Sequence, residues 1–432
     1  MLNRRQLLGA MGAAGIGIAA TACSTGGGQP APGATAAPTG ELKGTVHIVT
    51  PEFAGTDGKE AFEGKILKAF TDKHPGVTFQ VDYTPWDKLN EKLSTLVAGG
   101  QPSDLLMTGM GWTEPFAHKK VLTKLDKNAV LGDAKVLDAL VKQGSFNGDM
   151  YAMPFLLESR PFAYRKDLFE KFQISTTEPK SMEEFNSLLE EVKSKSGLVP
   201  LDMLGQNLRQ IWGQMIFAFG GTQFSPDGMS ITFDQEPGVK ALQWMVDLQN
   251  KGLSDFNFKV PTGQPSAYQQ DKTLMAWGSS GAWPQWLKQT PQLTEEGKLG
   301  IMLMPTVNGS KVLYQGGTLV GLSTRSQNSA AATAVMQHLI TPDALTQASL
   351  FSGKVPARSD LPPNPELAKN KLLDFSVDNL QYSVTDGGTP AWMEIRGKMD
   401  PELEAAVTGK KSVADTIASL KKIAEDAIGR IK

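Results

Sequence analysis

An alternation of strand-like and helix-like segments is the feature that most constrains the fold of this chain. Residues 44–50 (GTVHIVT) form a β-rich run, and residues 59–73 carry apolar side chains at helical spacing. Residues 77–83 alternate as a strand, residues 89–97 return to helical spacing, and residues 104–108 are typical of a short buried strand. This β-α-β-α-β order predicts an α/β fold, with helices on the faces of a sheet.

The remainder of the chain continues the mixed pattern. Ser181-Met182-Glu183-Glu184 is a capping box that predicts the start of a helix. Further helices are expected from Pro237 and over residues 328–340, 342–351 and 412–431, with a buried strand over residues 299–304. At about 150 residues per domain, a chain of 432 residues is expected to form two or three domains.

The composition excludes several classes of function. Lys+Arg 43 against Asp+Glu 45 gives a net charge of −2, so there is no basic excess that would indicate a nucleic-acid partner. Four scattered histidines and one cysteine argue against a metal centre, and a single cysteine excludes an internal disulfide. The phosphate-loop, nucleophile-elbow and zinc-helix motifs are absent from the sequence. We therefore expect no cofactor, no metal and no nucleic acid.

The first residues have the pattern of an export signal. Arg4 and Arg5 precede an apolar, small-residue stretch over residues 7–20, which is too short for a membrane span of about 20 residues. The only cysteine, Cys23, follows this stretch and resembles the lipidated cysteine of a bacterial lipobox, while residues 3–8 resemble a twin-arginine signal. We expect a signal peptide at 1–22 and a flexible linker at 23–42. The alternative is a free thiol in a disordered terminus.

A series of motifs in the folded part resembles one family. These are Gly99-Gly100-Gln101-Pro102-Ser103-Asp104, Met150-Tyr151-Ala152-Met153-Pro154 followed by Tyr164-Arg165-Lys166-Asp167-Leu168-Phe169, residues 180–185, residues 274–283, Gly316-Gly317 and Val355-Pro356-Ala357-Arg358. In this order and spacing they resemble the extracellular solute-binding proteins of bacterial ABC importers, above all the sugar-binding group that includes the maltodextrin-binding proteins. Arg165 stands where that pattern usually has Asn, and Ser103 is inserted before Asp104.

The resemblance implies a two-lobed periplasmic-binding-protein fold, type II-like, with a ligand cleft between discontinuous lobes. We expect lobe 1 to comprise residues 43–156 and 313–358, and lobe 2 to comprise residues 157–312 and 359–432. The two lobes would close on a hinge when a ligand contacts both of them.

Candidate ligand-binding residues follow from the chemistry of sugars, whose flat C–H faces suit aromatic rings and whose hydroxyls suit polar groups. Six tryptophans are candidates for stacking, although each could instead pack in the core: Trp283, Trp392, Trp112, Trp277, Trp212 and Trp86. The resemblance places Trp283, Trp392 and Glu158 in the cleft. Further candidates are Arg160, Arg358, Thr108, Gly109 and Gly317. Two arginines in the cleft would favour an anionic solute.

The sequence thus predicts a substrate-binding lipoprotein, anchored to the outer face of the cell membrane and not an enzyme. It would capture a mono- or oligosaccharide as a monomer and deliver it to ABC permease subunits in the membrane. Three alternatives remain: the same role for a non-sugar polar or anionic solute, a surface adhesin or scaffold, and a secreted glycoside-acting enzyme. The last needs two carboxylates about 5–10 Å apart, and Glu158 is the one visible candidate.

Overall fold

The computed structural model describes residues 41–203, 205, 207–261 and 264–431. The expected signal peptide and Cys23 lie outside the described residues. Within the described part, no helix combines the length and the apolar character needed to cross a membrane.

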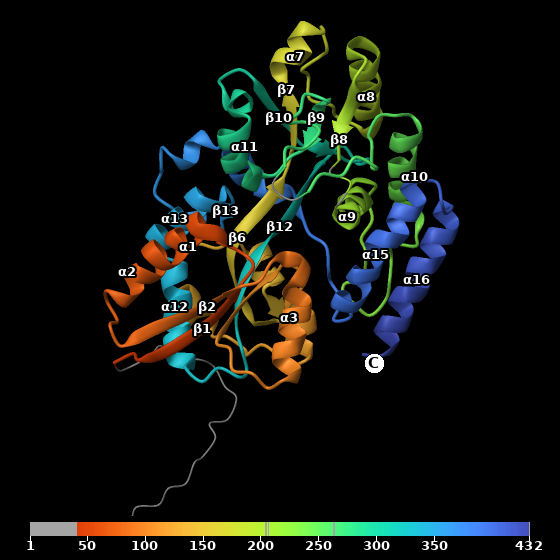
Figure 1. Cartoon of the computed structure of the whole chain (residues 1–432). Coiled ribbons are helices and arrows are strands. Elements are labelled where there is room, and N and C mark those ends of the chain that lie inside the picture. Colours follow the sequence, from red (N-terminus) through yellow and green to blue (C-terminus); the bar gives the residue numbers. More distant parts are fainter. Residues whose placement is uncertain (1–40, 204, 206, 262–263, 432) are drawn as a thin grey trace, which may run out of the picture. The chain divides into compact units, whose positions relative to one another are not determined.

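The first sheet confirms the expected β-α-β-α-β order. Strands β1 (Gly44–Thr50), β2 (Val77–Tyr83) and β3 (Leu105–Gly109) are parallel, with β1 between the other two. Side chains of β1 alternate between the faces of the sheet. Ile48 shares a core with Phe62 and Val335, while Val49 shares another with Leu89. Helices therefore cover both faces of this sheet, which we call the sheet of lobe 1 (Figure 1).

The second sheet has the strand order β10-β7-β9-β8. Its strands are β7 (Phe162–Arg165), β8 (Val199–Asp202), β9 (Thr273–Trp277) and β10 (Leu299–Met302). We call the part built on this sheet lobe 2. The strand expected over residues 299–304 is interrupted after Met302, because the next strand, β11 (Met304–Pro305), pairs with a different neighbour, β12.

Two long strands run from one lobe to the other, β6 (Ala152–Arg160) and β12 (Lys311–Leu322) (Figure 1). They pair with each other along most of their length, while β12 also pairs with β3 at one end and with β11 and β14 (Ser383–Val384) at the other. The short strand β13 (Val355–Pro356) pairs with β6. The expected lobe boundaries after residues 156 and 312 fall within β6 and β12, and the boundary after residue 358 falls two residues beyond β13. We propose that the hinge lies in these strands.

A glycine is required where β12 meets the middle of β6. Gly317 has φ +144°, and a Cβ atom there would lie 2.3 Å from the carbonyl oxygen of Leu156. The register of the pair shifts just beyond this residue, between Thr318 and Leu319. At this irregularity the backbones of β6 and β12 lie close together. Because Gly316 and Gly317 have no side chains, only backbone atoms of β12 line the cleft described below at these two positions.

Helices complete both lobes. Those that follow lobe 1 strands are α1 (Gly55–Lys59), the π-helical η1 (Glu60–Leu67), α2 (Lys68–Thr71), α3 (Trp86–Ala98), α4 (Thr113–His118), α5 (Lys127–Leu131), α6 (Asp138–Gln143), α12 (Ser329–Leu339) and α13 (Pro342–Ser352). The other helices are α7 (Lys166–Lys171), α8 (Met182–Ser196), α9 (Leu208–Ala218), α10 (Glu236–Asn250), α11 (Trp283–Gln289), α14 (Lys371–Asp378), α15 (Trp392–Val407) and α16 (Val413–Gly429). Short 3₁₀ turns and a hairpin make up the remaining elements: η2 (Ser280–Ala282), η3 (Pro291–Thr294), η4 (Leu367–Lys369), η5 (Leu380–Tyr382), β4 (Ser145–Phe146) and β5 (Asp149–Met150).

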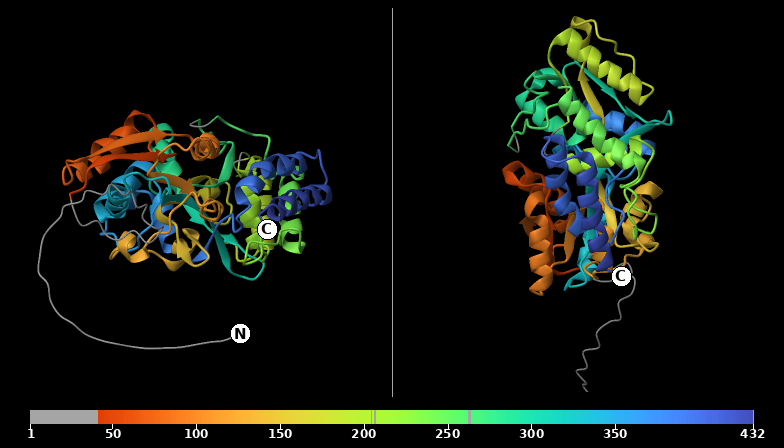
Figure 2. Two further views of the ribbon diagram at one scale, coloured as in Figure 1. Left: turned by 90° about the horizontal axis from the view of Figure 1, so that it is seen from below. Right: turned by 90° about the vertical axis from the view of Figure 1, so that its right-hand side faces the viewer.

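The expected capping box is confirmed at the start of α8, where the Ser181 hydroxyl accepts a hydrogen bond from the Glu184 backbone N–H. The C-terminal helices α15 and α16 pack against α10 in lobe 2, as Figure 2 shows in blue and green. The end of the chain is therefore part of lobe 2 and carries residues of α15 to the cleft.

Candidate functional site

A cavity of about 370 Å³ lies where the two lobes and the two long strands meet. We call it the cleft. Its lining residues come from the start of α3, the end of β3 and the loop after it, the strands β6 and β12, the start of α9, the segment before β13, the segment before α15, and α15 itself. They are Trp86, Asp87, Gly109, Met110, Trp112, Glu158, Arg160, Asn207, Arg209, Gln210, Tyr314, Gly316, Gly317, Lys354, Asp386, Arg396 and Asp400.

The topology explains why the cleft forms at this position. Strand β3 ends at Gly109, and its carboxyl end in an α/β sheet is the usual place for a ligand. Trp112 follows in the next loop, and the neighbouring helix α3 begins with Trp86. The two indole rings meet edge to face with their centroids 6.2 Å apart. One wall of the cleft is therefore aromatic.

Buried charges lie beside this aromatic wall, with the Lys354 ammonium 5.9 Å from the ring centroid of Trp86. The Lys354 ammonium lies 2.5 Å from Glu52 Oε1 and 3.5 Å from Glu158 Oε2. Glu52 also accepts a hydrogen bond of 2.6 Å from the Thr318 hydroxyl. Burial alone would lower the pKa of Lys354, but the two carboxylates outweigh that cost and raise it. Lys354 therefore holds its charge between an acid in the segment after β1 and an acid in β6.

Glu158 is the second centre of this network. It accepts a 2.7 Å hydrogen bond from Arg160 and a 2.9 Å hydrogen bond from Ser279, a lobe 2 residue. Burial would raise the pKa of Glu158, yet the charges of Arg160 and Lys354 and the Ser279 hydrogen bond bring it down to about 2. Glu158 is therefore ionised at neutral pH and can accept hydrogen bonds from a ligand.

Three arginines of the cleft lie over indole rings. Arg160 lies 4.8 Å from the ring centroid of Trp277, and Arg209, which forms an ion pair with Asp386, lies 5.4 Å from that of Trp392. Arg396 lies 4.8 Å from the ring centroid of Trp112. A guanidinium above an indole is held by cation–π attraction and keeps its edge N–H groups available.

The structure brings half of the twelve predicted binding residues together in the cleft: Trp86, Gly109, Trp112, Glu158, Arg160 and Gly317. Trp277 and Trp392 lie behind it, fully buried beneath Arg160 and Arg209. Thr108 is buried within β3.

The remaining predicted residues lie elsewhere in the fold. Trp212 is fully buried in the core of lobe 2, where its indole N–H donates to the Gly238 carbonyl. Arg358 forms a two-pronged contact with Asp360 and donates to the Ile340 carbonyl. Trp283 lies in a separate groove. Because these side chains are already engaged or covered, none of the three reaches the cleft.

Sequence reasoning missed several cleft residues, above all Lys354, Arg209, Asp386 and Arg396. Signals for two of them existed locally. Lys354 directly precedes the recognised Val355-Pro356 motif, and Arg396 lies one helical turn after Trp392. The partners of Lys354 and Arg209 lie far away in the sequence, so only the fold reveals that they are paired.

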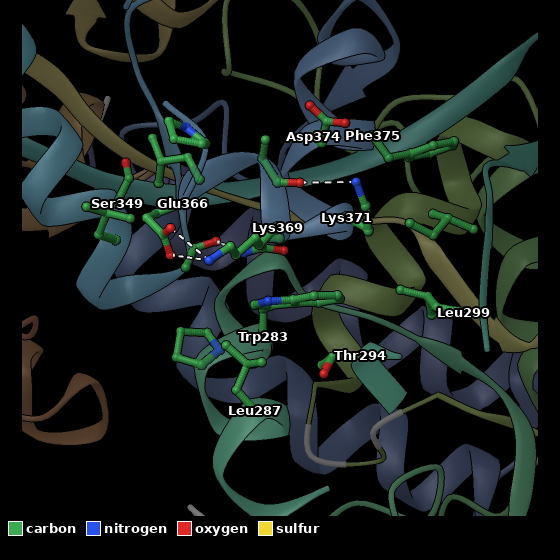
Figure 3. Close-up of a pocket in the computed structure, with 18 of the residues that line it drawn as sticks. Trp283, Leu287, Thr294, Leu299, Ser349, Glu366, Lys369, Lys371, Asp374 and Phe375 are labelled. Carbon is green, nitrogen blue, oxygen red and sulfur yellow. Dashed lines mark hydrogen bonds and ion pairs between the residues drawn. The ribbon is translucent and has the colours of Figure 1, made fainter. Parts of the chain in front are cut away.

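A larger groove of about 1120 Å³ lies beside Trp283 (Figure 3). Helices α11 and α14, strand β10 and the turn η4 form most of it. Its charged residues include Lys369 and Glu366, which form an exposed ion pair. Trp283 is only 4% exposed, so its ring offers little surface to a ligand. Neither the aromatic wall nor the buried ion pairs of the cleft are repeated in this groove.

No group of three or more His, Cys, Asp or Glu residues in the described part of the chain is arranged to hold a metal ion. The contacts of the cleft instead suit a polar organic molecule, since hydrogen-bonding groups and indole rings face one small cavity.

Comparison with known proteins identifies the family. The sequence profile of the bacterial extracellular solute-binding proteins matches residues 55–346. The diacetylchitobiose binding protein DasA of Streptomyces coelicolor is 23% identical over 418 residues, covering 94% of this chain and 95% of that protein. A binding protein of Brucella abortus is 28% identical over 157 residues, but the match spans only 37% of its length and 36% of this chain.

Solved structures share the fold. The GacH receptor of Streptomyces glaucescens, studied without ligand and with acarbose, has a TM-score of 0.77 at 20% identity and covers 91% of this chain and 100% of its own. The sugar-binding protein MalE of Xanthomonas citri has a TM-score of 0.76 at 20% identity, over 90% of this chain and 98% of its own. The two-lobed α/β fold expected from the sequence is thereby confirmed.

Proposed function

Because this chain belongs to the bacterial extracellular solute-binding proteins, we propose that its cleft captures a carbohydrate for an ABC importer. The observation that carries this proposal is the lining of the cleft, which combines the exposed ring of Trp86 with the hydrogen-bonding groups of Glu158 and Arg160. An aromatic wall facing polar side chains suits a sugar, whose faces are apolar and whose rim is made of hydroxyls.

Trp86 is the ring best placed to receive a sugar face. It is 39% exposed and begins helix α3 at the rim of the cleft. Trp112 is 2% exposed and is covered by Arg396, so its role is to hold Trp86 and Arg396 in place by packing against them. Glu158 accepts hydrogen bonds from ligand hydroxyls, as its ionised state allows.

Capture proceeds by hinge closure. The cleft takes residues from both lobes, so a ligand contacts all of them at once only when the lobes are together. Glu158 and Gly316 are paired neighbours on the two crossing strands, which couples the ligand directly to the hinge.

The wider role follows from the sequence signals. Lipidation at Cys23 would hold the protein at the outer face of the cell membrane, and the linker over residues 23–42 would let the lobes reach the permease subunits. The protein works as a monomer and performs no catalysis. The names of DasA and MalE as binding proteins for sugars support this assignment.

The test is a thermal-shift screen of the purified protein against a panel of mono- and oligosaccharides. A true ligand raises the melting temperature in proportion to its concentration relative to its Kd. The expected result is stabilisation by at least one sugar, with no product released over hours of incubation. Release of a hydrolysis product would contradict the proposal and favour a glycoside-acting enzyme.

A further inference from the structure

Arg396 is a cation of the cleft for which the described residues provide no ion-pair partner. It extends from α15 of lobe 2, is half-buried and lines the cavity. The other basic residues of the cleft are each paired with a carboxylate: Arg160 with Glu158, Arg209 with Asp386, and Lys354 with both Glu52 and Glu158.

The acids of the cleft are engaged elsewhere. Glu158 and Asp386 belong to the ion pairs above. Asp400 accepts a 2.8 Å hydrogen bond from the backbone N–H of Arg209 at the start of α9. Asp87 lies in the first turn of α3, where an acid is stabilised by the helix dipole. Each carboxylate therefore has a direct partner or a helix dipole beside it, whereas Arg396 has no direct ion pair and only the longer-range attraction of Asp400, one turn along α15.

The surroundings of Arg396 penalise its charge. Burial, with the neighbouring charge of Arg209, lowers the pKa of Arg396 to about 10. At neutral pH the guanidinium is still protonated, so the cleft holds a partly buried cation without a direct ion pair. An anion entering the cleft would remove this penalty.

The geometry around Arg396 suits an oxyanion. The guanidinium centre lies 4.8 Å from the ring centroid of Trp112, which also meets Trp86 edge to face. Stacking on the ring constrains the planar guanidinium and leaves its N–H edge for a ligand, and that edge matches the paired oxygens of a carboxylate or phosphate. The nearby Trp86 ring offers the apolar surface that a sugar face requires.

We propose that the ligand of this cleft is an acidic sugar, a small carbohydrate bearing a carboxylate or a phosphate ester, and that Arg396 binds its anionic group. This inference rests on the function proposed above and narrows it to one chemical class. The cavity of about 370 Å³ lies at the small end of the roughly 300–1,000 Å³ typical of ligand pockets, which favours a ligand the size of a mono- or disaccharide.

The first experiment needs no variant. Isothermal titration calorimetry at low ionic strength compares glucose and galactose with glucuronate, galacturonate and glucose 6-phosphate. Because a hydrogen bond between charged groups is stronger than one between neutral groups, the acidic sugar should bind at least about tenfold more tightly than its neutral counterpart. Comparison of the two uronates with glucose 6-phosphate shows whether the cleft prefers a carboxylate or a phosphate ester. The preference should shrink as ionic strength rises.

Substitutions then assign the anion to Arg396. Arg396→Gln should bring the affinity ratio of acidic to neutral sugar close to one. Arg396→Lys should keep part of the preference for the acidic sugar, because the lysine ammonium retains the positive charge but not the planar guanidinium. The matched control is Arg430→Gln at the end of α16, which breaks an exposed ion pair with Glu394 of α15 and should leave the ratio unchanged.

The outcomes separate the two proposals. Equal affinity for acidic and neutral sugars in the unaltered protein would overturn this inference and leave carbohydrate capture standing. A preference that survives Arg396→Gln would overturn the role of Arg396. Failure of every neutral and acidic sugar to bind would count against both proposals.

Discussion

The cleft around Lys354 and the groove beside Trp283 both contain indole rings and charged side chains, but the ion pairs of the cleft are more deeply buried than the ion pair of the groove. The groove is the larger, at about 1120 Å³ against about 370 Å³. Its Lys369–Glu366 pair is 66% and 59% exposed, whereas Lys354 and Glu52 in the cleft are each 9% exposed. Exposed pairs contribute little to stability, while buried charges are costly unless each is matched. The matched, buried charges and not the volume therefore distinguish the candidate site.

The largest effect should come from breaking a buried pair. Lys354→Met leaves Glu52 and Glu158 without their shared cation, and loss of one partner from a buried ion pair costs about 3–5 kcal/mol. The free energy of unfolding, measured by denaturant titration, should fall by that amount. The same change in the groove, Lys369→Met, should cost about 0–1 kcal/mol. Equal losses at both positions would remove the distinction between the two cavities.

The next effect is a pH dependence carried by Glu158. The folded pKa of about 2 lies below the ordinary value of 4.5, so the stabilisation is complete above pH 4.5 and is lost as pH falls through 2. The difference corresponds to about 3 kcal/mol at neutral pH. Unfolding measured between pH 7 and 2 should show a shallower decline in Glu158→Gln than in the unaltered protein. The exposed Glu366→Gln change should leave the decline as it is.

Ligand binding provides a smaller contrast between the two cavities. Trp86→Ala removes the exposed ring of the cleft and should weaken binding of the sugar found by thermal shift by about 1–2 kcal/mol. Calorimetry measures this loss. Leu287→Ala, in the groove, should leave the affinity unchanged. The resemblance assigns sugar stacking to Trp283, so a loss of affinity in Trp283→Ala at unchanged melting temperature would shift the candidate site towards the groove.

The smallest effect is expected where the lobes approach each other on the surface. Lys288 of α11 lies 3.2 Å from Asp57 of α1, and both side chains are more than 70% exposed. Lys288→Ala should change stability and ligand affinity by less than about 1 kcal/mol, with the difference vanishing in high salt. A larger change would mean that surface pairs, as well as the buried network, set the balance between open and closed lobes.

Local sequence patterns predict much of the fold. The strands over residues 44–50 and 77–83 were expected at the residues that β1 and β2 occupy, because alternation and turn residues are encoded within a few positions. The cleft residues near recognisable motifs were also predictable: Glu158 follows Met150-Tyr151-Ala152-Met153-Pro154, and Trp112 follows the strand that ends at Gly109. The burial of Trp212 was harder to foresee, since a tryptophan in a helix can face a core or a ligand.

By itself the sequence determined the alternating α/β architecture, the family motifs and the export pattern at the start of the chain, because each depends on residues close together. The tertiary structure decided which charges meet. Lys354 and Glu52 are 302 positions apart, and Arg209 reaches Asp386 only because α9 and the segment before α15 pack in the same lobe. It also left Arg396 unpaired within the described chain, since whether a charge is matched depends on its neighbours in space.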